Sequence, residues 1–63
     1  MNNKIIRETR LKQNIGLREF IRMLNKETDI TAEKYSKFEA GMNVILNEKE
    51  LAAVAKILNI KEF

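Results

Sequence analysis

Three polar side chains that can form hydrogen bonds, Glu33, Lys34 and Lys37, occur at helical spacing within residues 30–41. Apolar residues precede, separate and follow these side chains, at Ile30, Tyr35 and Phe38, and Gly41 ends the segment. This pattern predicts a short helix with an apolar inner face and a polar outer face. A second short amphipathic segment, 16–24, lies just upstream, and two such helices joined by a turn form a helix-turn-helix. Sequence-specific DNA binding is therefore the first hypothesis.

Four short helices are expected from the apolar spacing and the capping residues. The first runs from about residue 3 to 13, with Ile5, Ile6 and Leu11 as its apolar stripe, and the second from 17 to 24 or 25. The third, 31–40, begins at Thr31. The fourth follows the N-cap residue Asn47 and closes at position 59. The apolar connector 42–46 is expected to lie against the core. The expected fold is all-α, a compact bundle of four to five helices forming one domain over residues 1–63.

Composition excludes several classes of function. The 63 residues contain no Cys and no His, so we expect no disulfide, no metal site, no cofactor and no enzymatic activity. No apolar run approaches the roughly 20 residues needed to cross a bilayer, and residues 1–7 do not resemble a secretion signal. We therefore expect a cytoplasmic protein that does not bind membranes or an evident small-molecule ligand.

The net charge of +3 is unevenly distributed along the chain. Residues 1–26 carry seven basic and two acidic side chains, a net charge of +5, whereas residues 27–63 carry five basic and seven acidic ones, a net charge of −2. A positive half favours polyanions. An ordinary solubilising surface explains the same charge equally well.

Three segments, in this order and at these distances, resemble the Cro/phage-repressor (XRE-like) helix-turn-helix family. Residues 35–41, YSKFEAG, are similar to the end of the family's recognition helix. Residues 6–10, IRETR, resemble its first helix with its arginine, and residues 50–60, ELAAVAKILNI, resemble its Leu-x-x-Ile-Ala-x-x-Leu-Gly-Val pattern. The resemblance covers residues 6–60 and implies a phage-repressor-like DNA-binding domain.

The resemblance also implies a structural ion pair between Arg10 and Glu39. A partly buried bidentate pair would hold the first helix against the third. The alternative is that these are two unrelated surface charges.

The family's docking geometry implies that the third helix lies in the major groove of double-stranded DNA. The implied base-reading residues are Ala32, Glu33 and Lys37. Lysine can donate to guanine O6 and N7, glutamate can accept from cytosine N4, and alanine can contact a thymine methyl group. The implied phosphate contacts are Gly16, Arg18, Arg22, Thr31 and Lys34.

A homodimer on a palindromic operator is the expected form, because one small domain contacts only half a site. The expected dimer contacts are Ile45, Leu46, Leu58, Ile60 and Phe63. A small transcriptional repressor of a phage or mobile element is the leading interpretation. The alternative is a protein-interaction module on the same fold, such as an antagonist of a larger regulator, with Leu17, Met23 and Met42 as apolar contacts.

Overall fold

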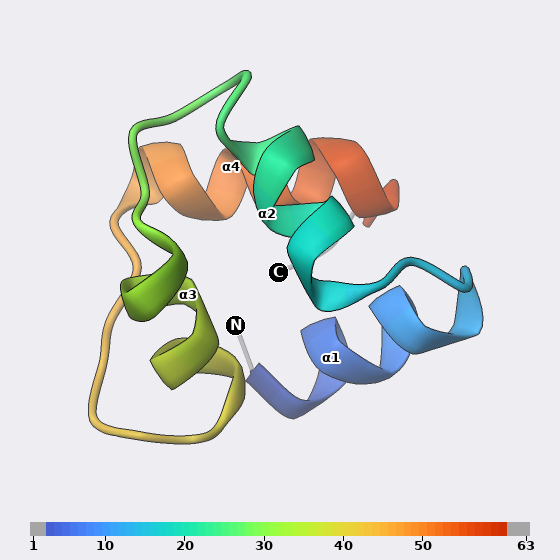
Figure 1. Ribbon diagram of the computed structural model, residues 1–63, viewed down its shortest axis with the longest axis horizontal. Coiled ribbons are helices and arrows are strands. Elements are labelled where there is room, and N and C mark those ends of the chain that lie inside the picture. Colours follow the sequence, from blue (N-terminus) through green and yellow to red (C-terminus); the bar gives the residue numbers. More distant parts are fainter. Residues whose placement is uncertain (1–2, 61–63) are drawn as a thin grey trace.

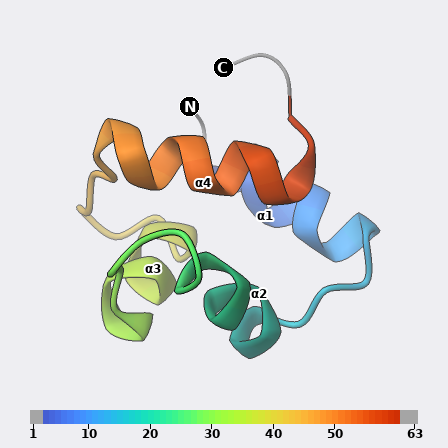
Figure 2. The same ribbon diagram turned by 90° about the horizontal axis from the view of Figure 1, so that it is seen from above.

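The computed structural model describes residues 3–60, which form four helices and no strand (Figure 1). The helices are α1 (Asn3–Lys12), α2 (Leu17–Leu24), α3 (Ala32–Glu39) and α4 (Glu48–Leu58). The bounds of the four expected helices are confirmed to within one residue. The all-α class is confirmed as well. In Figure 2, α4 lies along one side of the molecule, and α2 and α3 lie on the opposite side.

A single core joins the four helices, because each contributes at least one fully buried side chain. The largest are Ile6, Phe20, Leu24, Tyr35, Val54 and Leu58. The ring of Tyr35 lies between two phenylalanines, with ring centroids 5.3 Å from Phe20 and 6.0 Å from Phe38. The contact between Phe20 and Tyr35 packs α2 against α3, whereas the contact between Tyr35 and Phe38 lies within α3.

The helix ends have the capping residues that the sequence predicts. The Thr31 hydroxyl accepts a hydrogen bond from the backbone N–H of Lys34 at 3.1 Å, and so caps α3. Asn47 and Glu50 form a reciprocal capping box at the start of α4. Gly41 follows α3 with a φ of +78°, a left-handed conformation that favours glycine.

The expected apolar stripe of α1 is wrong in two of its three positions. Ile6 is fully buried, but Ile5 and Leu11 are 55% and 51% exposed. The inward face is formed by Ile6 and by Arg10, which is four residues further along and only 6% exposed. A buried arginine, rather than Ile5 or Leu11, therefore joins Ile6 on the inward face of α1.

The connector between α3 and α4 lies against the core over only part of its length. Leu46 is buried and Val44 packs against the core, but Met42 and Ile45 are 56% and 86% exposed. The expected dimer contacts at Leu46 and Leu58 need correction, because both side chains fill the core of the protomer. Ile60 is half-buried against the core, and Phe63 lies outside the described residues.

The segment between α2 and α3 is held by its own hydrogen bonds. The Asn25 side chain donates to the carbonyl of Ile30 at 2.7 Å, and the Thr28 hydroxyl accepts from the N–H of Ile30. Thr28 and Ile30 are both buried. The seven residues 25–31 include no glycine, and these side-chain hydrogen bonds instead fix the turn that leads into α3.

Replacing Tyr35 by phenylalanine is expected to raise the free energy of unfolding by up to about 1 kcal/mol, because a buried hydroxyl without a partner is costly. The Tyr35 hydroxyl is buried and makes no hydrogen bond to another group of residues 3–60. Burial and the neighbouring Glu39 carboxylate raise the pKa of Tyr35 above its ordinary value. Urea unfolding at pH 7 tests this expectation. A loss of more than about 1 kcal/mol would instead show that the hydroxyl is bonded to Glu39.

Candidate nucleic-acid interface

Arg10 and Glu39 form the ion pair that the sequence analysis expects. Arg10 Nε donates to Glu39 Oε2 and Arg10 Nη2 donates to Glu39 Oε1, both at 2.9 Å. The remaining nitrogen, Nη1, donates to the carbonyl of Ile15 at 2.7 Å. Hydrogen bonding to Glu39 raises the pKa of Arg10. The guanidinium thus connects α1 to the end of α3 and to the turn before α2.

The three predicted base-reading residues are exposed and lie together on α3. Ala32 is in the first turn, and Glu33 and Lys37 follow at helical spacing. Lys37 Nζ lies 3.0 Å from Glu33 Oε1, an ion pair between residues four apart. Such an exposed pair contributes only about 0.3–0.5 kcal/mol to stability, so both side chains can exchange this contact for another partner at little cost.

Two predicted phosphate contacts line an open groove between α2 and the start of α3. Arg18 and Arg22 are exposed, and they surround this groove together with Ile21 and Ala32. They are four residues apart, which brings both guanidinium groups to one side of α2. Gly16 is the N-cap of α2, and within residues 3–60 no group apart from its chain neighbours lies within 4 Å of the place where a Cβ would stand.

Lys34 differs from the other expected phosphate contacts, because its ammonium is bound to α4. Lys34 Nζ donates to Glu50 Oε1 and Oε2 at 2.8 and 3.0 Å, and Glu50 Oε1 also accepts from the N–H of Asn47. Burial opposes ionisation of Glu50, but these bonds outweigh it and lower the pKa of Glu50. The pair fastens the first turn of α3 to the first turn of α4.

Replacing Glu50 by glutamine is expected to cost about 1 kcal/mol at pH 7, because the pair with half-exposed Lys34 is partly screened. A carboxylate whose pKa is lowered by folding contributes its full stabilisation when the pH is above its pKa in the unfolded state. This stabilisation disappears as the pH falls through its pKa in the folded state. Glu50→Gln and the unchanged protein should therefore differ at pH 7 and converge as the pH falls below the ordinary pKa of glutamate, as measured by urea unfolding. Parallel pH profiles would contradict this role for the ion pair.

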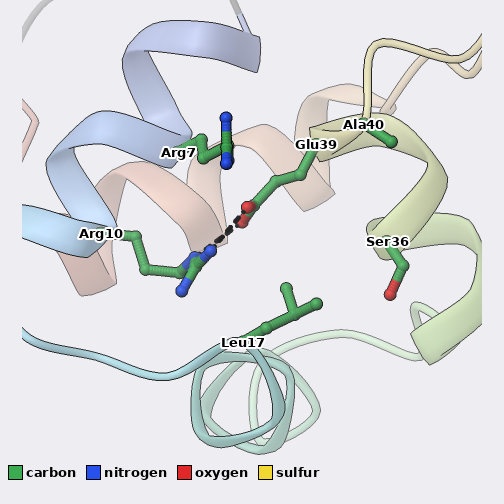
Figure 3. A pocket seen from close by; sticks show the side chains of 6 residues that line it. All are labelled: Arg7, Arg10, Leu17, Ser36, Glu39 and Ala40. Carbon is green, nitrogen blue, oxygen red and sulfur yellow. Dashed lines mark hydrogen bonds and ion pairs between the residues drawn. The ribbon is translucent and has the colours of Figure 1, made fainter.

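A second open groove lies between α1, the start of α2 and α3 (Figure 3). Its lining residues are Arg7, Arg10, Leu17, Ser36, Glu39 and Ala40. Arg7 was not among the expected phosphate contacts. The sequence does contain one indication that Arg7 lies near Arg10: the two are three residues apart, which places both arginines on one side of α1.

Within residues 3–60, no three acidic, histidine or cysteine side chains come together in a way that could hold a metal ion. None of the helices in this range has the length and apolar character needed to span a membrane. Comparison of the chain with protein-family models, curated proteins and solved structures finds no match. The function must therefore be inferred from the arrangement of these residues.

Proposed function

We propose that this chain is a sequence-specific DNA-binding protein that inserts α3 into the major groove, as the Cro/phage-repressor resemblance implies. Two observations on α3 carry the proposal: Glu33 and Lys37 are exposed on its outer face, and Ala32, in its first turn, lines a groove together with Arg18 and Arg22. The polar pair on α3 supplies one donor and one acceptor for base edges. The arginines supply positive charge for the phosphates beside them.

The charge around α3 is one-sided, which favours one orientation on the duplex. Arg18 and Arg22 line the side formed by α2, whereas Lys34, which reaches from α3 toward α4, is neutralised by Glu50. Among the described residues of the connector 42–46 there is no cation. We therefore assign the phosphate contacts to the α2 side, with the backbone N–H groups after Gly16 as further donors.

A two-fold dimer on an inverted repeat belongs to this proposal, because one domain of this size reaches only half a site. With Leu46 and Leu58 placed in the core, the described residues that remain of the expected contact set are Ile45, which is 86% exposed, and Ile60, which is half-buried. A regulator of transcription, with repression as the simplest action, is the function that such binding supports.

Selection of binding sites from a randomised duplex pool tests the proposal. We expect enrichment of an inverted repeat that the purified protein binds at least about 10³-fold more tightly than scrambled DNA. Sedimentation of the complex should give two protomers per duplex. Absence of any enriched sequence would reject sequence-specific DNA binding.

A protein-interaction module is the second candidate, and the exposed side chains of Met42 and Ile45 favour it. The connector that carries them lacks the cations of a phosphate-binding loop. Leu17 and Met23, the other apolar contacts expected for this function, are half-buried. Weak DNA binding without sequence preference, combined with loss of partner binding in Ile45→Ser, would favour this candidate.

A further inference from the structure

We propose that the groove between α1, α2 and α3 holds a phosphate of the DNA backbone, with Arg7 as its charged ligand. This inference rests on the proposed DNA-binding function and adds a contact from α1, a helix to which that function assigned none. Arg7 is exposed and lines the groove opposite Ser36, which lies on α3 (Figure 3). Within residues 3–60, the Arg7 side chain makes no ion pair or hydrogen bond.

The charge of the groove favours an anion. Arg10 and Glu39 also line it, but they are 6% and 7% exposed and neutralise each other through two hydrogen bonds. Because Arg7 is not neutralised in this way, the residues that line the groove carry a net charge of +1. The Ser36 hydroxyl, half-buried on the opposite wall, adds a neutral donor. A tetrahedral oxyanion fits this combination of a free guanidinium and a hydroxyl.

The place of the groove favours a backbone phosphate over a free anion. Ser36 and Ala40 form its α3 wall and adjoin Lys37, which lies on the exposed face assigned to base reading. Ala32, at the other end of α3, lines the groove of Arg18 and Arg22. The two grooves thus lie beside the two ends of α3, as expected for successive contacts along a DNA backbone that passes the helix.

Arg7→Gln tests this assignment, with Lys49→Gln as the matched control, because Lys49 is an exposed cation on α4 outside both grooves. On the selected duplex, Arg7→Gln should weaken binding about tenfold per protomer of the bound dimer and for every sequence equally, which is the effect of losing one charge-assisted hydrogen bond per protomer. The slope of log K against log salt should become shallower by about 0.9 per lost contact. Ser36→Ala should weaken binding less and leave the slope unchanged.

The outcomes separate this inference from the function on which it rests. If the unchanged protein selects no sequence, the proposed function fails. If it selects a sequence and Arg7→Gln matches Lys49→Gln in affinity and salt slope, only the phosphate site is overturned. Inorganic phosphate provides a second probe. Amide shifts at residues 7, 17 and 36 that appear at millimolar phosphate without DNA would show a free-anion site and overturn the assignment to the DNA backbone.

Discussion

Arg10→Met is expected to lower the free energy of unfolding by about 3–5 kcal/mol, because it leaves the buried Glu39 carboxylate without a partner. Glu39 is 7% exposed and receives two hydrogen bonds from Arg10. The variant also removes the donor to the carbonyl of Ile15. Domains of this size have only a few kcal/mol of stability in total, so the variant should be largely unfolded at 25 °C. Far-UV circular dichroism with urea unfolding measures this loss.

Two further variants distinguish a stranded charge from general damage to the fold. Arg10→Met combined with Glu39→Met removes both charges and should recover most of the loss. Arg22→Met removes an exposed arginine and should change stability by less than about 0.5 kcal/mol. A single Arg10→Met variant within about 1 kcal/mol of the unchanged protein would show that the pair contributes little.

The second large effect is expected in DNA recognition, at Lys37. Lys37→Gln should lose about 1–3 kcal/mol of discrimination at the one base pair that the lysine reads, while affinity for scrambled DNA falls only slightly. The reason is that a guanine edge offers two acceptors to an ammonium group, and Lys37 is exposed on the outer face of α3. Competition binding with duplexes substituted at each position of the selected site measures this preference.

Exchanging the two charges provides the control for Lys37→Gln. The double variant Glu33→Lys with Lys37→Glu keeps the net charge and an ion pair between residues four apart. It interchanges donor and acceptor along α3, so it should fold normally and select different bases. Selection of the original sequence by this double variant would exclude both residues from base reading.

The helices could be predicted because their ends carry local signals. Thr31, Asn47 and Gly41 act at the helix ends through backbone hydrogen bonds or a left-handed conformation within a few residues, and the sequence contains that information directly. The pair between Arg10 and Glu39 was reached through a family resemblance, because spacing alone does not indicate a contact between residues 29 apart.

What could not be predicted depends on contacts between helices. Lys34 was expected to reach phosphate, but its ammonium is bound by Glu50, which is 16 residues away in the chain. Arg10 occupies the inward face of α1, so Ile5 and Leu11, expected in the core, are exposed. The Arg7 groove requires three helices to be placed before its lining residues come together. Hydrophobic periodicity describes each helix separately and therefore misses all three features.

The most direct test of DNA recognition is a salt titration of the selected duplex against a scrambled one. Three arginines per protomer, Arg7, Arg18 and Arg22, give six ionic contacts in a dimer, which predicts a slope of log K against log salt of about −5. The preference for the selected duplex should persist at every salt concentration, because base contacts are less sensitive to salt than phosphate contacts. Equal affinity for the two duplexes, whatever the slope, would contradict the proposed function.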